Sequence, residues 1–377
     1  MTKASEQTTD PIAPLNPWEA KFRTLFELLR SLPDVRTASL PLAEVLTREG
    51  EAIAAAHREK EPAVALLLAC TREAAPIWRQ GESSEDQAAL LDADLPSAQV
   101  QATVARMHGF PEWADAVENL AAHVDPLFEA ACDAIVLGDA ERLRALLGSK
   151  PALIHARSSF AHHATLLHHV ACNGIESHRQ WQVPAKAPEI AGVLLEAGAD
   201  PNATCDSYGP GTSLLQLLIT SGFSNPAIQA DVVERLCKGG AAMNGPLDDG
   251  EPLWAAITCG RAAVAERLAS CGARLDNLVF AAALGDLPAV QRFLQDAASS
   301  LAASARRAGA NGPRLDPAHL LEYALIFAAT NGRTNTVRYL LTQKPDLTVR
   351  EPIWNTTALD QARFNQQADV TALLEAH

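Results

Sequence analysis

The stretch TLLHHVACNG (residues 165–174), followed by PEIAGVLLEAGADPN (188–202), decides the fold of this chain. In both pieces apolar residues recur at helical spacing: Leu167, Val170 and Ala171 in the first, then Ile190, Val193, Leu194 and Ala197 in the second. Thr165 is a good N-cap residue, and Gly174 and Gly198 stand where a helix needs a residue tolerant of positive φ to end. The stretch predicts two short helices, each with an apolar stripe that it cannot bury alone.

The same frame returns along the rest of the chain. It falls at Glu129–Gly138, Thr165–Gly174, Ser213–Gly222, Glu251–Gly260, Asp276–Gly285, Tyr323–Gly332 and Thr357–Gln366. By subtraction, successive starts lie 36, 48, 38, 25, 47 and 34 residues apart. The ending GADPN (198–202) is followed by the similar endings GAAMN (240–244) and GARLD (272–276). This self-similarity predicts a series of stacked helix pairs.

TLLHHVACNG resembles TPLHxAAxxG, the opening helix of an ankyrin repeat, with Leu166 where proline is usual. The resemblance implies an all-α fold, an ankyrin-repeat solenoid of about seven units over residues 125–377. It also implies a protein-binding scaffold that contacts a partner through the concave surface and the finger tips, without covalent chemistry. His168 stands at the histidine position of the ankyrin motif, and the resemblance implies that it makes structural hydrogen bonds. Gln216 and Trp254 replace that histidine in later units, either as groove contacts or as repacked core.

A different organisation precedes the repeats. Residues 1–16 are polar and predict a disordered tail, and residues 17–124 predict an N-terminal helical module. The stretch LPSAQVQATVARMHGFPEWADAVENL (95–120) resembles a helical module found ahead of ankyrin arrays in bacterial proteins. Asp125 followed by Pro126 is a strong helix start and marks the first repeat. The module is expected to cap the apolar face of that repeat.

Composition narrows the class of partner and the compartment. The net charge of −14 disfavours a nucleic-acid or anionic membrane surface and favours a cationic patch on a protein partner. The chain has no long uncharged apolar run, and its N-terminus lacks the apolar segment of a signal peptide, so we expect a cytoplasmic protein. Seven cysteines without a CxxC pair predict small buried hydrophobes in a reducing compartment. We expect no cofactor and no metal.

Insertions interrupt the period at three places. We expect them at residues 175–188 and 223–230, between the two helices of a unit, and at residues 299–318, after a second helix. The first two should touch, because the helix–helix loops of adjacent units stack along one edge. They would form a patch containing His178, Arg179, Trp181, Phe223 and Asn225. Such inserts often carry a binding function, and an alternative to the scaffold is an enzyme or small-ligand binder with a pocket where they meet the array.

The remaining candidate chemistry gathers around residues 155–208. Six of the eleven histidines lie between His155 and His178, but one metal ion does not reach them all, because His162 and His178 flank a helix about 15 Å long. His162, His163 and His169 are more plausible as groove contacts. Tyr208 belongs to DSYGPGTS (206–213), a turn or an anion-binding loop, and DDGE (248–251) is a finger turn or a carboxylate pair.

Overall fold

The computed structural model describes residues 17–33, 41–72, 84–108, 110–123, 125–160, 162–172, 179–180, 183–207, 210–221, 224–296 and 315–377. This part of the chain is mostly helical. Its single sheet is a hairpin of two very short strands, β1 (Thr204–Cys205) and β2 (Thr212–Ser213). No helix in it combines the length and apolar character needed to cross a bilayer.

Six helices form the N-terminal part. They are α1 (Pro17–Ser31), α2 (Leu42–Arg58), α3 (Pro62–Arg72), α4 (Ser84–Asp92), α5 (Ser97–Met107) and α6 (Trp113–His123). α2 packs against α3, α5 and α6, and its Leu46 and Ile53 are fully buried. Its Glu49 meets His108, just past the end of α5, in a buried ion pair with 2.7 Å between Oε2 and Nε2. These helices share one hydrophobic cluster.

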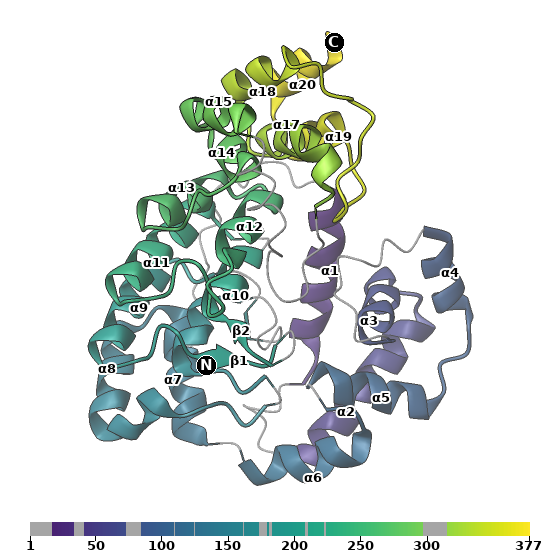
Figure 1. The fold of residues 1–377 in the computed structure, drawn as a ribbon. Coiled ribbons are helices and arrows are strands. Elements are labelled where there is room, and N and C mark those ends of the chain that lie inside the picture. Colours follow the sequence, from purple (N-terminus) through teal and green to yellow (C-terminus); the bar gives the residue numbers. More distant parts are fainter. Residues whose placement is uncertain are drawn as a thin grey trace.

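Helix pairs follow from residue 126, and each predicted frame overlaps the first helix of one pair, although α7 and α17 begin three residues before their frames. The pairs are α7 (Pro126–Leu137) with α8 (Ala140–Ser149), η3 (Leu166–Val170) with α9 (Ala187–Glu196), α10 (Leu214–Thr220) with α11 (Pro226–Lys238), α12 (Glu251–Thr258) with α13 (Ala262–Ser270), α14 (Leu278–Leu284) with α15 (Leu287–Gln295), α17 (Leu320–Thr330) with α18 (Thr334–Leu341), and α19 (Ala358–Phe364) with α20 (Ala368–Glu375). Two further turns of 3-10 helix are η2 (Pro151–His155) and η4 (Pro317–His319). Figure 1 shows the pairs succeeding one another in chain order.

The start and end of α7 have clear local causes. The Asp125 carboxylate accepts a hydrogen bond of 3.0 Å from the backbone N–H of Leu127, and Pro126 occupies the first helical position, where no N–H is needed. The helix ends at Gly138 in the left-handed conformation, with φ of 67°. A Cβ atom there would lie 2.9 Å from the Cβ of Lys186, so glycine satisfies both the dihedral and the close approach.

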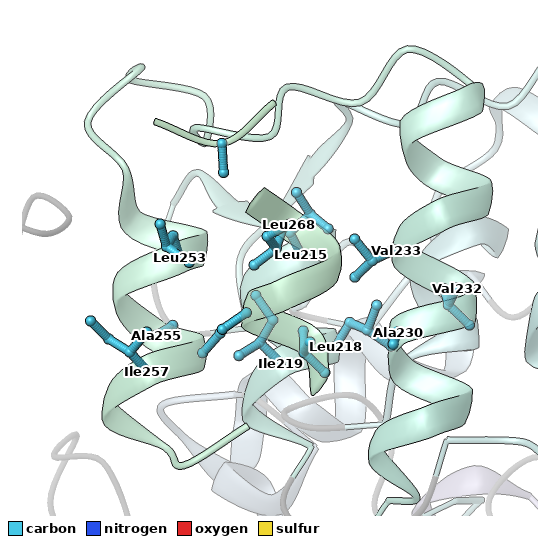
Figure 2. Packing of buried hydrophobic residues seen from close by; sticks show 14 of the residues in the cluster. Leu215, Leu218, Ile219, Ala230, Val232, Val233, Leu253, Ala255, Ile257 and Leu268 are labelled. Carbon is cyan, nitrogen blue, oxygen red and sulfur yellow. The ribbon is translucent and has the colours of Figure 1, made fainter. Parts of the chain in front are cut away.

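Packing between pairs buries the apolar stripes. The first helices contact each other in the order α7, η3, α10, α12, α14, α17, α19, and the second helices α8, α9, α11 and α13 do the same. Figure 2 shows Leu215 and Leu218 of α10 among Val233 of α11 and Leu253 of α12. One continuous hydrophobic cluster results, from Phe128 to Leu374. No pair buries its own stripe, so each depends on its neighbours for stability.

A row of rings joins the N-terminal helices to the first pairs. Phe160 follows η2 in sequence, yet it is buried in the hydrophobic cluster of the N-terminal helices. Its ring stacks with those of His108, with 6.3 Å between centroids, and His162, with 5.9 Å. The loop that leads into η3 is therefore attached to both parts of the chain.

The insertions are shorter than the sequence predicts. α9 begins at Ala187 and α11 at Pro226, so residues 187–188 and 226–230 belong to helices. Asn225, predicted as a patch residue, caps α11, since its side chain accepts a hydrogen bond of 2.9 Å from the N–H of Ala227. η4 takes the end of the third insertion. The predicted tail at residues 1–16, Gly174, Phe223 and residues 299–314 lie outside the described residues.

Candidate functional site

The segments that connect the first five helix pairs follow one another along one edge of the stack, and neighbouring segments are hydrogen-bonded to each other. We call the described residues of these four segments, 156–160 with 162–165, 199–207 with 210–213, 241–250 and 273–277, the finger edge. In the second of these segments β1 pairs with β2, Thr204 opposite Ser213 and Cys205 opposite Thr212. In the first, Arg157 forms a β-bridge with Thr165. The helices therefore present a row of short turns at this edge.

Hydrogen bonds fix the first two segments of the finger edge to each other. One Nη of Arg157 donates to the carbonyl oxygens of His163, at 2.9 Å, and Thr204, at 2.7 Å. The Asp206 N–H donates to the His162 carbonyl at 2.8 Å. The Asp206 carboxylate also lies 2.7 Å from Nδ1 of His163. Side chain and backbone thus hold neighbouring fingers in one arrangement.

Two asparagines at the same frame position repeat this linkage further along. Asn202 donates to the Gly240 carbonyl at 3.1 Å and accepts from the Ala242 N–H at 2.7 Å. Asn244 accepts from the Arg274 N–H at 2.9 Å. Each amide connects its own finger to the next one along the stack. The sequence signal for these two residues is the Asn shared by GADPN and GAAMN, which helical periodicity does not report.

The finger at residues 241–250 exposes an apolar side chain among carboxylates. Leu247 is 69% exposed, and Asp248 beside it is held by Arg274, with 2.6 Å between Oδ2 and Nη1. Gly245 and Gly250 both have a φ of 82°, which lets the tip turn tightly on each side of Leu247. The arrangement presents one leucine on a fixed turn.

His168 and His169 lie inside the stack. His168 Nδ1 accepts the N–H of Thr165 at 3.2 Å and meets the Thr165 hydroxyl at 2.8 Å, which agrees with its expected structural role. Burial, followed by the nearby positive charge of His169, lowers the pKa of His168 to about 3. His169 is fully buried and its Nδ1–H donates to the Thr165 carbonyl at 3.1 Å. The prediction of His169 as a groove contact is wrong, because its ring packs edge-on against Phe128.

His162 and His163 lie on the finger edge with different surroundings. His162 is half-buried, and its Nδ1 accepts the Ala164 N–H at 3.1 Å. Its ring lies between Phe160 and His169. His163 is exposed and contacts Asp206. Of the histidines predicted as contacts, His163 is the one that offers most of its ring to solvent, whereas His178 lies outside the described residues, as do Trp181 and Tyr208.

The side chain of Arg179 is buried inside the protein. Its side chain is 4% exposed and forms an ion pair with Glu129 of α7, whose side chain is 8% exposed. It also donates to the Glu129 carbonyl at 3.1 Å and lies 3.4 Å from Asp133. The predicted surface contact is therefore corrected to a buried link between the insertion and the first helix pair. The sequence could not reveal this, because Glu129 is 50 residues away.

The side chains of Gln180 and Gln229 donate hydrogen bonds to backbone carbonyls at the ends of two short first helices. The Gln180 amide donates to the carbonyls of His169, at 3.1 Å, and Ala171, which η3 leaves without helical partners. In the next unit, Gln229 donates to Leu218 at 2.6 Å and to Ser221 at 3.1 Å. The insertions also touch each other, as expected, since the Val183 N–H donates to the Ser224 hydroxyl at 2.8 Å.

Trp254 and Gln216 occupy equivalent frame positions but differ in burial. Trp254 is buried, and its ring packs edge-on against Phe327 with 5.2 Å between centroids and lies 6.3 Å from Phe280. Trp254 is therefore part of the repacked core, and the prediction that it contacts a partner is corrected. Gln216 is half-buried on α10, where its N–H donates to the Ser213 hydroxyl at 3.1 Å.

In DDGE (248–251), predicted as a finger turn or a carboxylate pair, Glu251 has a strongly raised pKa. Burial raises the pKa of Glu251 to about 7, and the charge of Asp249 adds to this effect. Glu251 begins α12, directly below the exposed turn. Within the described ranges, His, Cys, Asp and Glu side chains do not gather in groups of three that could hold a metal ion.

A cleft of about 580 Å³ lies elsewhere, between α1, α2 and α3. Leu28, Leu32 and Ala56 form its apolar wall, with Glu27 and Glu59 also lining it. This cleft belongs to the N-terminal helices and is separate from the place where the insertions meet the array.

Comparison with known proteins finds likeness among solved structures alone. No family model matches this chain, and no curated protein does. Among solved structures, the crystal structure of the human ASB11 ankyrin repeat domain is similar at 20% sequence identity and a TM-score of 0.36. The match covers 66% of this chain and 97% of that one.

Proposed function

We propose that this chain is an ankyrin-repeat scaffold that binds a protein partner along the finger edge and the adjoining face of the first helices, without covalent chemistry. Residues 125–377 form the solenoid, and residues 17–124 are a helical module that caps it. The order in which the helix pairs pack, and the hydrogen bonds of His168 with Thr165, support this assignment.

The observation that carries the proposal is the lateral linkage of the fingers. Arg157, Asn202 and Asn244 each connect one finger to the next through hydrogen bonds of 2.7–3.1 Å. A surface that is already ordered loses less conformational entropy on binding than a set of independent loops. Three successive linkages therefore favour a fixed recognition surface over connecting loops without a role.

Leu247 is the expected anchor of the interaction. Its exposed side chain is a single large apolar group on a rigid turn, flanked by Asp248 and Asp249. Full burial of a leucine side chain contributes about 1.5–3 kcal/mol, or roughly 10- to 150-fold in affinity. The carboxylates and the net charge of −14 favour a partner with an apolar pocket rimmed by lysine or arginine.

The test compares two leucines of equal exposure. Leu247 is 69% exposed at the finger tip, whereas Leu137 is 68% exposed at the opposite end of a first helix. Partners are captured from native cytosol with the full chain and with the variants Leu247→Ala and Leu137→Ala, and the affinity for the recovered partner is then titrated. We expect Leu247→Ala to weaken binding about tenfold or more and Leu137→Ala to leave it unchanged. Equal losses for both variants would refute a role for the finger edge.

The alternative, a small-ligand binder or an enzyme at the insertions, has less support. Arg179 and Gln180 use their side chains on Glu129 and on the end of η3. The cysteines whose side chains are described are thiols rather than disulfides, as is usual in reducing compartments, which supports a cytoplasmic location.

A further inference from the structure

Two cysteines from adjacent helix pairs meet at the outer layer of the stack. Cys237 lies in the last turn of α11, and Cys271 caps the end of α13. The Cys237 Sγ atom is 3.8 Å from the Cys271 carbonyl oxygen. Both cysteines are half-buried, and the adjacent Lys238 and Gly272 are exposed, so small reagents in solution have access to this place.

The approach of the two residues is set by packed helices. α11 and α13 contact each other directly. Arg267 of α13 forms an ion pair with Glu234 of α11 and lies 3.8 Å from Asp231 of the same helix. These contacts hold the ends of both helices at a constant separation, and therefore keep Cys237 beside Cys271.

We propose that Cys237 and Cys271 form a reversible disulfide when the protein meets hydrogen peroxide. In the first step the thiolate of one cysteine attacks a peroxide oxygen, an S–O bond forms as the O–O bond breaks, and the leaving hydroxide takes up the proton that the thiol released, which gives a sulfenic acid and one water. In the second step the other thiol attacks the sulfenic sulfur, the S–O bond breaks, and the hydroxyl leaves with the thiol proton as a second water. Two thiols are oxidised by two electrons and one peroxide is reduced to two waters.

The surroundings of Cys237 reduce its reactivity. Burial, followed by the neighbouring Cys271 side chain, raises the pKa of the Cys237 thiol to about 11. Because the thiolate is the nucleophile, this raised pKa slows the attack of Cys237 on peroxide.

The bond would join two units that carry the finger at residues 241–250 between them. It closes a loop between positions 34 residues apart, which removes freedom from the unfolded chain and stabilises the folded one. Oxidation therefore tightens the stack at this place. The inference concerns the chemistry of two thiols and does not rest on the proposed binding function.

The experiment uses the full chain treated with graded hydrogen peroxide, then alkylated, digested and analysed by mass spectrometry without reduction. We expect the Cys237–Cys271 linked peptide to be the main product, to disappear on addition of dithiothreitol, and to accompany an upward shift of the unfolding temperature. Cys259 is half-buried as well, at the end of α12, and the variant Cys259→Ser should behave as the parent.

Two variants keep the outcome decisive. In Cys237→Ser the linked peptide should be lost and Cys271 should be trapped as a sulfenic acid by a 1,3-dione reagent. In Cys271→Ser the remaining Cys237 should react with peroxide more slowly than a thiol of ordinary pKa. Recovery of both thiols as separate alkylated or sulfinic peptides would overturn the proposal, as would links scattered among the other cysteines.

Discussion

Replacing Arg179 by methionine should destabilise the folded protein by about 3–5 kcal/mol, because it removes the cation that is ion-paired with the buried Glu129. The Arg179 and Glu129 side chains are 4% and 8% exposed. Asp133, also near Arg179, is 43% exposed, so water replaces that contact at little cost. The loss of stability therefore comes almost entirely from the broken ion pair with Glu129.

The double variant Glu129→Leu with Arg179→Met should recover most of that loss. Replacing a buried ion pair by apolar residues of similar volume is often neutral or stabilising, since no charge remains to be desolvated. The assay is urea unfolding followed by circular dichroism for the parent, both single variants and the double variant. We expect a coupling free energy of about 2 kcal/mol or more between the two sites.

The matched control is Arg363→Met, which breaks an ion pair of 2.7 Å with Glu375. Both side chains of that pair are about half exposed, so the loss should stay under about 1 kcal/mol. An equally small loss for Arg179→Met would refute the reasoning. It would mean that Arg179 lies in solvent and is free to contact a partner.

Three further predictions concern pH and backbone conformation. Burial raises the pKa of Glu251 from 4.5 to about 7, so ionisation of this carboxyl destabilises the folded state as the pH rises from 4.5 to 7. Glu251→Gln should therefore raise the unfolding temperature above pH 7 and leave it unchanged below pH 4.5. Burial lowers the pKa of His168 from 6.5 to about 3, so stability is complete above pH 6.5 and falls as the pH drops toward 3; thermal unfolding of His168→Gln should show a flatter slope there. Gly138→Ala should lower the free energy of unfolding by about 1–2 kcal/mol, because φ is 67° and the new Cβ meets Lys186, whereas Gly148→Ala within α8 should stabilise by about 0.5–1 kcal/mol; a stabilising Gly138→Ala would contradict the left-handed end of α7.

Periodicity predicted the helix pairs because it reports a local property. A stripe of apolar residues at helical spacing, closed by glycine, places a short helix wherever the frame falls, and Asp125 with Pro126 places its start. Stacking then follows, since such thin helices need neighbours. The structural hydrogen bonds of His168, which involve Thr165 three residues away, were implied by the resemblance to the ankyrin motif rather than by the period.

The site residues depended on contacts between distant segments, which periodicity does not report. His169 and Trp254 resembled candidates for recognition because polar or large side chains stood in the frame, but the neighbouring units that cover them decide their burial. Arg179 lies in an insertion without any period, and its partner Glu129 belongs to the preceding unit. Phe160 likewise joins the hydrophobic cluster of the N-terminal helices, in which the preceding buried residue, Ala116, lies 44 residues earlier by subtraction.

The most direct test of the scaffold claim is hydrogen–deuterium exchange of the full chain, alone and with the partner recovered by capture. We expect amide protection to increase at residues 156–165, 199–213 and 241–250 and to stay constant at the helix–helix turns around Gly138 and Gly285. Protection confined to those turns, or to the N-terminal helices, would contradict binding through the finger edge.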